Sequence, residues 1–182
     1  MISNFLYKCY KKIKTYLERN YILSQIKFEN EECRKSCIIG DNVKIYNPNV
    51  RFGKKVQLYS NVVIWGDGDV YIDDNSKIGF NVIIYASKGA GVYIGKNVAI
   101  AANCYIIDAN HTLSSDRMEH PNDSVEKIEI GDNVWLGANC VCAKGSALGN
   151  GAVLGACSFL NSKIPGQTMA AGSPAKIIKN IM

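Results

Sequence analysis

The chain of 182 residues contains only two histidines, and one of them, His111, follows Asp108-Ala109-Asn110. An imidazole titrates near neutral pH, so it can take a proton from a hydroxyl group and pass it on. Asp108 or a backbone carbonyl could fix the tautomer of the His111 imidazole, and Asn110 immediately precedes His111. We therefore predict that His111 is a general base, with Asp108 and Asn110 as its catalytic neighbours. A solvent-exposed or loop-anchoring histidine is the alternative.

A metal centre is disfavoured by the same scarcity of ligands. Two histidines cannot supply three imidazoles to a catalytic zinc within one subunit. His120, in Met118-Glu119-His120-Pro121, is expected to serve loop structure instead. Cys33 and Cys37 are four residues apart, but no matching Cys or His cluster completes a zinc site. We expect no metal.

The seven cysteines are predicted to be reduced thiols that fill space. Their number is odd, and the chain has neither CxxC spacing nor a secretory signal. Cys104, Cys140 and Cys142 fall at repeat positions suited to core filling, which disfavours an acyl-cysteine intermediate.

A period of six residues predicts the fold that positions these groups. Aliphatic residues recur every sixth position in three runs, often followed by Gly. The runs are Ile72, Ile78 and Ile84; Ile94, Ile100 and Ile106; and Ile130, Leu136, Cys142, Leu148, Leu154 and Leu160. Neither a helix nor a simple alternating strand has this period. Three hexapeptides form one triangular coil, which buries its aliphatics only by stacking on other coils. We predict an all-β solenoid of hexapeptide repeats.

The insertions in this repeat collect at a single corner of the predicted prism. First strands fall near Cys33, Phe52, Ile72, Ile94, Ile130 and Leu148. In this phase every insertion lies between the third strand of one coil and the first strand of the next. The largest is an excursion over residues 112–127, and His111 opens it. Because long loops on a tight solenoid are usually functional, this position supports the catalytic interpretation of His111.

The two ends of the chain leave the repeat. Over residues 1–30 we expect an amphipathic helix, with apolar residues on one face and Lys8, Lys11, Lys12, Lys14 and Arg19 elsewhere. The apolar residues are Ile2, Phe5, Leu6, Cys9, Ile13, Tyr16 and Leu17. We favour a helix that caps the solenoid, which spans residues 31–174; a basic helix on an anionic membrane is the alternative, and both could hold. Residues 175–182 are expected to form a short basic tail.

Composition narrows the class of partner and the compartment. The chain is 47% hydrophobic and 20% charged, which is typical of a soluble globular protein. No apolar stretch approaches the ~18 residues of a membrane span. The net charge of +5 is modest, and we expect no nucleic-acid partner. We predict a cytoplasmic protein, with peripheral attachment to the inner face of the membrane as an alternative.

Two stretches resemble the hexapeptide-repeat acyltransferases: residues 128–140 (IEIGDNVWLGANC) and the turn at residues 171–176 (AGSPAK). Over residues 35–180 the chain is most similar to sugar O-acetyltransferases of maltose, galactoside and surface-polysaccharide pathways. It lacks the N-terminal substrate segment typical of the maltose enzymes, which favours the polysaccharide branch. The resemblance implies a left-handed parallel β-helix, a homotrimer with active sites between subunits, and acetyl-CoA as acyl donor.

The resemblance also assigns roles to individual residues. His111 matches the catalytic histidine of the family, and Trp135 matches a tryptophan beside the cofactor cleft, with packing at the trimer interface as an equal alternative. Further implied cofactor contacts are Ala138 and Ala156 to pantetheine and Lys176 and Lys179 to the nucleotide phosphates. Asn161 and Lys163 are also implied: the family carries Thr-Lys where this chain has Asn161-Ser162, and Lys163 follows one place later.

These observations together predict O-acetylation of a sugar hydroxyl, in a bacterial surface polysaccharide or its precursor. His111 would take the proton from the acceptor as it attacks the thioester. One alternative is N-acetylation of an amino-sugar nucleotide, although such enzymes often carry an added nucleotide-binding domain for which this chain has no room. A non-catalytic scaffold and a γ-class carbonic anhydrase relative, which would bind zinc, are the others.

Overall fold

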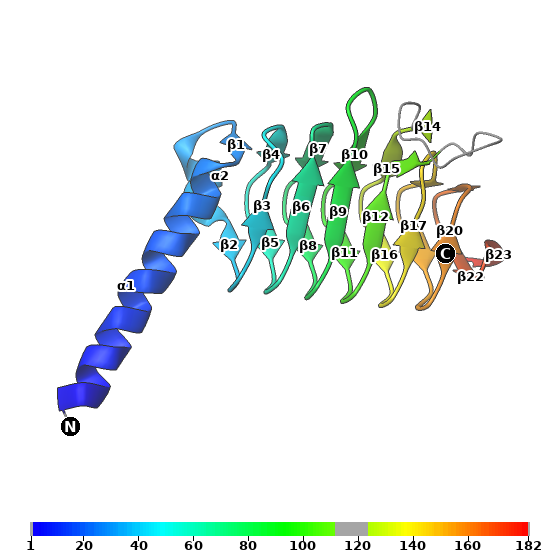
Figure 1. Cartoon of the computed structure of the whole chain (residues 1–182). Coiled ribbons are helices and arrows are strands. Elements are labelled where there is room, and N and C mark those ends of the chain that lie inside the picture. The colour runs from blue at the N-terminus through cyan, green and yellow to red at the C-terminus, as the bar shows by residue number, and fades with distance from the viewer. Residues whose placement is uncertain (1, 112–123, 182) are drawn as a thin grey trace.

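The structure, a computed structural model, describes residues 2–111 and 124–181, with side chains from residue 6 onward. The chain forms a parallel β-solenoid behind a long N-terminal helix (Figure 1). Helix α1 (Ile2–Ser24) comes first, and the short helix α2 (Glu31–Ser36) follows in the first coil. The solenoid predicted from the six-residue period is confirmed.

In the described residues three sheets form the sides of the prism, and successive coils add one strand to each. Their strands pair in parallel, except that β23 pairs antiparallel with β22. Sheet A contains β1 (Lys27–Phe28), β4 (Val50–Phe52), β7 (Asp69–Ile72), β10 (Gly91–Ile94), β15 (Ile128–Ile130), β18 (Ala147–Leu148) and β21 (Lys163–Ile164). Sheet B contains β2 (Ile38–Ile39), β5 (Gln57–Leu58), β8 (Lys77–Ile78), β11 (Ala99–Ile100), β16 (Trp135–Leu136), β19 (Val153–Leu154), β22 (Thr168–Gly172) and β23 (Ala175–Asn180). Sheet C contains β3 (Lys44–Ile45), β6 (Val63–Gly66), β9 (Ile83–Ala86), β12 (Tyr105–Ile107), β17 (Val141–Cys142) and β20 (Phe159–Leu160).

Residues one coil apart stack in register, so like aliphatics meet inside the prism. In sheet A, Ile94 pairs with Ile72 on one side and with Ile130 on the other. These three side chains are at most 3% exposed, and the matching positions of sheets B and C are equally buried. Because a coil has no second layer to cover its apolar face, this stacking supplies the core.

Asparagines shape the corner between sheets B and C. Asn42, Asn61, Asn81 and Asn103 all adopt positive φ, a conformation that Asn tolerates better than most residues. Their amides form a ladder: Asn42 Nδ2 donates to Asn61 Oδ1 at 2.9 Å, Asn61 to Asn81 at 3.0 Å, and Asn81 to Asn103 at 3.0 Å. The ladder ties the successive coils together along this edge.

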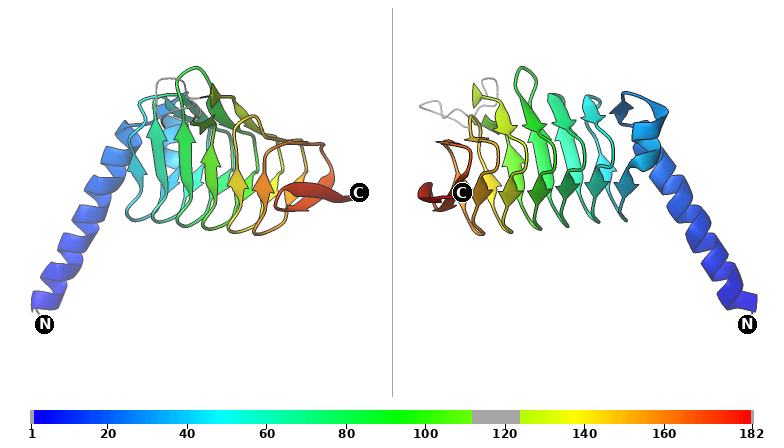
Figure 2. Two further views of the ribbon diagram at one scale, coloured as in Figure 1. Left: turned by 45° about the vertical axis from the view of Figure 1, so that its right-hand side comes forward. Right: turned by 180° about the vertical axis from the view of Figure 1, so that it is seen from behind.

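The insertions gather at the corner between sheets C and A, as predicted from the phase of the repeat. The loops that leave β3, β6, β9 and β12 all lead from sheet C to sheet A, and they lie on the same edge in Figures 1 and 2. The last of them is the excursion, whose base is a two-stranded antiparallel ribbon of β13 (Ala109–Asn110) and β14 (Ser124–Val125).

Both ends of the solenoid differ from the expected boundaries of 31 and 174. The first strand of sheet A is β1, which pairs with β4, whereas Cys33 lies buried in α2 and not in a strand. The expected tail is the strand β23, which folds back antiparallel on β22 and extends sheet B. Hydrogen bonding to an open sheet edge thus orders residues that leave the hexapeptide pattern.

Helix α1 projects away from the solenoid, and only its end packs on the core (Figures 1 and 2). Ile22, Leu23 and Ile26 are buried there, whereas Leu6 and Ile13 are 60% and 59% exposed. The expected capping role therefore applies only to the last turn of the helix. Among the described residues, no helix has the length and apolar character needed to cross a bilayer.

Candidate active site

His111 directly follows β13, at the corner between sheets C and A where the excursion leaves the prism. Antiparallel pairing of Asn110 with Ser124 closes the base of the excursion, and the side chains of Asn110 and His111 are both exposed. A regular strand therefore holds the backbone up to the residue before His111 while the imidazole stays accessible. Its role as a base stays a prediction.

Asp108, which immediately precedes β13, is fully buried. Its two carboxylate oxygens accept from the backbone N–H of Ser87 at 2.9 and 3.0 Å, which ties β13 to the loop between β9 and β10. Burial raises the pKa of the Asp108 carboxyl, and hydrogen bonds that include those from Ser87 and Gly91 oppose the rise. Asp108 thus supports the corner on which His111 stands, and its predicted action on the imidazole stays a prediction.

The return strand of the excursion is held by the next coil, through residues that sequence reasoning missed. Lys144 Nζ donates to Ser124 Oγ at 2.6 Å, and Gly145 N–H donates to the Glu126 carbonyl at 3.1 Å. Gly145 has φ +72°, and an added Cβ would collide with the Glu126 carboxylate. The signal available in the sequence was a glycine outside the usual Gly position of the hexapeptide.

Most of the predicted cofactor residues lie along sheet B and its corner with sheet C. Trp135 is 56% exposed on β16, and Ala138 and Ala156 occupy that corner in successive coils. Cys157 N–H donates to the Ala138 carbonyl at 2.9 Å, so these two turns are stacked. Lys176 and Lys179 are exposed on β23, which belongs to the same sheet.

Two predicted cofactor residues lie elsewhere. Asn161 is exposed at the corner between sheets C and A, and Lys163 is exposed on β21 of sheet A. They share the side of the prism that carries His111, not the side of Ala138 and Ala156. The two corners terminate opposite ends of sheet C, roughly five extended residues or about 16 Å apart. One chain therefore does not bring the imidazole and the predicted pantetheine corner together.

The repeat cysteines face the interior, which confirms that they fill the core. Cys104, Cys140 and Cys142 are at most 1% exposed, and Cys104 Sγ donates to the Gly137 carbonyl at 3.2 Å. Burial raises the pKa of the Cys142 thiol to about 12, so the thiolate of Cys142 is disfavoured, whereas a hydrogen bond with Cys104 lowers the pKa of the buried Cys140 to about 7.

His120 lies outside the described residues. Across residues 2–111 and 124–181, no group of three or more His, Cys, Asp or Glu side chains is placed to hold a metal ion.

Comparison with known proteins places this fold in a family. The profile described as the hexapeptide repeat of succinyl-transferase matches residues 69–107 and 127–162. The Escherichia coli protein WbbJ, named as a lipopolysaccharide biosynthesis O-acetyltransferase, is 32% identical over 174 residues, which cover 90% of this chain and 86% of WbbJ.

Solved structures share the architecture at low sequence identity. A variant of AntD, an N-acyltransferase from Bacillus cereus in complex with dTDP-4-amino-4,6-dideoxyglucose and coenzyme A, superimposes with a TM-score of 0.78 and 20% identity, over 92% of this chain and 89% of AntD. The hexapeptide-repeat acetyltransferase VCA0836 from Vibrio cholerae, complexed with acetyl coenzyme A, superimposes with a TM-score of 0.59 and 20% identity, over 94% of this chain and 78% of VCA0836. The left-handed parallel β-helix is confirmed.

Proposed function

We propose an O-acetyl transfer reaction on the premise that this chain belongs to the hexapeptide-repeat acyltransferase family. The proposed donor is acetyl-CoA, and the proposed acceptor is a sugar hydroxyl in a bacterial surface polysaccharide or its precursor. The name of WbbJ supports O-acetyl transfer in such a pathway. The complexes of AntD and VCA0836 support a coenzyme A thioester as donor.

The observation that carries the proposal is the exposed imidazole of His111 on a strand-supported corner beside the excursion. In the proposed step His111 takes the proton of the acceptor hydroxyl while the oxygen attacks the thioester carbonyl. The tetrahedral intermediate then expels the thiolate of coenzyme A, which recovers the proton from the imidazolium. An ester forms, a thioester breaks, and His111 returns to its neutral state.

The separation of the two corners supports a homotrimeric assembly. His111 lies at one end of sheet C, and Ala138 and Ala156 lie at the other. A cyclic trimer that sets the B–C corner of one subunit beside the C–A corner of the next would unite base and donor. We propose this arrangement, with Trp135 beside the donor and Lys176 and Lys179 near its phosphates. Asn161 and Lys163, at the C–A corner, would then contact a donor bound at the B–C corner of the neighbouring subunit.

The test of the base is His111→Ala, compared with His111→Gln. General-base assistance accounts for ~10²–10⁴ in rate, so both variants should lose about that factor in kcat. Binding of acetyl-CoA, measured by calorimetry, should change by less than about threefold, because the base acts only when the hydroxyl is attacked. The unfolding temperature of each variant, measured in parallel, separates a loss of catalysis from a loss of folded protein. Normal turnover in His111→Ala would overturn the assignment.

The acceptor is tested by a screen of acetyl-CoA consumption. Neutral sugars, lipid-linked oligosaccharides and isolated surface glycan are compared with amino-sugar nucleotides. We expect turnover with a hydroxyl acceptor and formation of an alkali-labile ester. Turnover restricted to an amine acceptor would replace O-acetyl transfer with N-acyl transfer, the activity named for AntD.

A further inference from the structure

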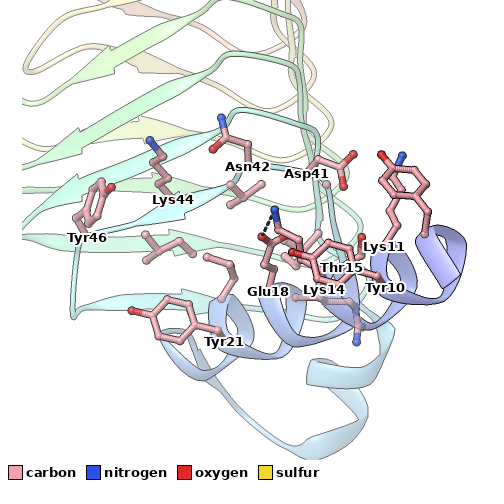
Figure 3. A pocket seen from close by; sticks show the side chains of 17 residues that line it. Tyr10, Lys11, Lys14, Thr15, Glu18, Tyr21, Asp41, Asn42, Lys44 and Tyr46 are labelled. Atoms are coloured by element: carbon pink, nitrogen blue, oxygen red, sulfur yellow. Dashed lines mark ion pairs between the residues drawn. The ribbon is translucent and has the colours of Figure 1, made fainter. Parts of the chain in front are cut away.

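The side of α1 that faces the solenoid carries charged side chains together with tyrosines and Ile22. Between the helix and the first coil lies a groove of about 740 Å³, shown in Figure 3. Lys11, Lys14 and Glu18 line it from the helix, and Asp41 and Asn42 line it from the solenoid. Lys14 Nζ lies 3.7 Å from Glu18 Oε1 within the helix. The helix therefore does not use its apolar stripe to contact its own solenoid.

That stripe lies on a different side of the helix, where it is exposed. Leu6, Ile13 and Leu17 are 60%, 59% and 61% exposed, and none of the three lines the groove. Their spacing of seven and four residues places them on one face of an α-helix. Figures 1 and 2 show this part of α1 extending well beyond the first coil. Among the described residues the apolar face thus has no packing partner, and it is open to a flat surface.

The charge of the molecule is concentrated on the same helix. Residues 2–24 contain five cationic side chains and one acidic side chain, whereas the rest of the chain contains 16 and 15. Almost all of the net charge of +5 therefore belongs to α1. Lys12 and Lys14 flank Ile13 in sequence and leave the helix about 100° to either side of it. Tyr16, which is exposed and does not line the groove, borders the stripe as aromatic residues do at a membrane interface.

We propose that α1 is an interfacial anchor that lies on an anionic lipid surface, with Leu6, Ile13 and Leu17 in the boundary of the acyl chains. A narrow apolar stripe, flanking lysines and low overall hydrophobicity are the features of helices that lie in the plane of a bilayer surface. A second copy of α1 is a poorer partner, because parallel helices with five cations and one acid each would repel along their seam. Attachment through α1 leaves the solenoid and its corners outside the lipid.

One consequence rests on the proposed function: an anchored transferase would meet acceptors that are themselves lipid-linked. The binding of α1 to lipid is independent of that function, because it is inferred from exposure and charge alone. Its test accordingly uses vesicle binding without turnover, so that failure of the anchor and failure of the proposed reaction are distinguishable.

The experiment is co-sedimentation of the full chain with vesicles of phosphatidylcholine alone or mixed with phosphatidylglycerol. We expect binding to the anionic vesicles that weakens as salt is raised. Ile13→Asp should lower the partition coefficient by about tenfold or more, since it removes apolar contact and adds a negative charge. The matched control is Ile38→Asp, which changes a side chain of 57% exposure on β2 and should leave vesicle binding unchanged. Lys12→Gln should lower binding about fivefold.

Light scattering tests whether the stripe instead binds a second copy of this chain. We expect the oligomeric mass to be the same for the wild-type chain and Ile13→Asp. Absence of wild-type binding to anionic vesicles would overturn the proposal. A lower oligomeric mass in Ile13→Asp would overturn it in favour of a second copy of this chain. Equal loss of binding in Ile38→Asp would show that the stripe is not the contact surface.

Discussion

Asp108 provides the sharpest test of how the candidate site is built, because its described contacts and its predicted catalytic role lead to different outcomes. The buried carboxylate accepts from Ser87 N–H, and Gly91 N–H contributes a further hydrogen bond. Asp108→Ala leaves these donors unpaired in a buried place, at about 1–3 kcal/mol for each group. We expect a loss of about 2–4 kcal/mol in the free energy of unfolding, because water entering the vacated space offsets part of the penalty.

Asp108→Asn keeps one oxygen acceptor and removes the charge. It should destabilise the fold by about 1 kcal/mol, and the loss should depend on pH. Because burial raises the pKa of Asp108, the folded state binds more protons than the unfolded state above the unfolded pKa of about 3.9. The stability of the wild type therefore falls as pH rises from the unfolded pKa to the raised folded pKa of Asp108. The asparagine of the variant does not titrate in this range of pH. The advantage of the wild type, measured by urea unfolding, should be largest near pH 4 and shrink towards pH 7.

Turnover of the same variants separates support of the corner from direct action on the imidazole. An Asp108 that supports the corner predicts that Asp108→Asn keeps kcat within about tenfold and leaves the pH–rate profile in place. A carboxylate that fixes the tautomer of His111 predicts a loss of about 10³ or more together with a displaced profile. Full stability combined with such a loss would refute the supporting role described above.

Three further predictions concern the donor corner, the core and the asparagine ladder. In a Cys9→Ser background, a maleimide should label the exposed Cys157 before the buried thiols. Because the donor is proposed to lie at the neighbouring Ala156, acetyl-CoA should slow the labelling of Cys157. A labelling rate that acetyl-CoA leaves unchanged, measured by mass spectrometry, would contradict that placement. Ile84→Ala should lower the free energy of unfolding by about 2–5 kcal/mol, because this side chain is fully buried in the stacked core. Asn81→Ala should lower the unfolding temperature more than Asn81→Gly, since both break the ladder but only alanine is strained at a φ of 58°.

The fold could be predicted closely from the sequence because one physical constraint acts on every coil. An aliphatic such as Ile94 must stack on Ile72 and Ile130, so the pattern of six repeats wherever the core does. The constraint weakens at the ends, where a coil has a neighbour on only one side. The assignment of Cys33 to a strand failed there: the chain formed α2, and the side chain of Asn30 accepts from Cys33 N–H to cap it. The strand β23 was missed for a similar reason: it forms hydrogen bonds to the open edge of sheet B, and its sequence does not follow the hexapeptide pattern.

The candidate site could be located from the sequence but not assembled. Counting insertions placed His111 at the correct corner, since a loop can leave the prism only where it does not interrupt a stacked strand. The pairing of Asp108 with Ser87 was not foreseeable, because the two residues are 21 positions apart and the Ser87 backbone carries no side-chain signal. The phase of the repeat also places Ala138 and His111 at different corners, which a motif match alone does not reveal.

The helix α1 shows why periodicity alone does not identify a partner. Its apolar stripe was visible in the sequence, and the nearest apolar surface was the open end of the solenoid, so capping was the simplest interpretation. Yet Ile22 and Leu23 at the end of the helix are buried on a different face from Ile13, and this difference in face turns the stripe away from the core. A helical period determines which residues share a face, whereas the rotation at the junction determines what that face meets. An outward stripe on the helix that carries almost all of the net charge of the chain favours a charged external surface over the interior of the same molecule.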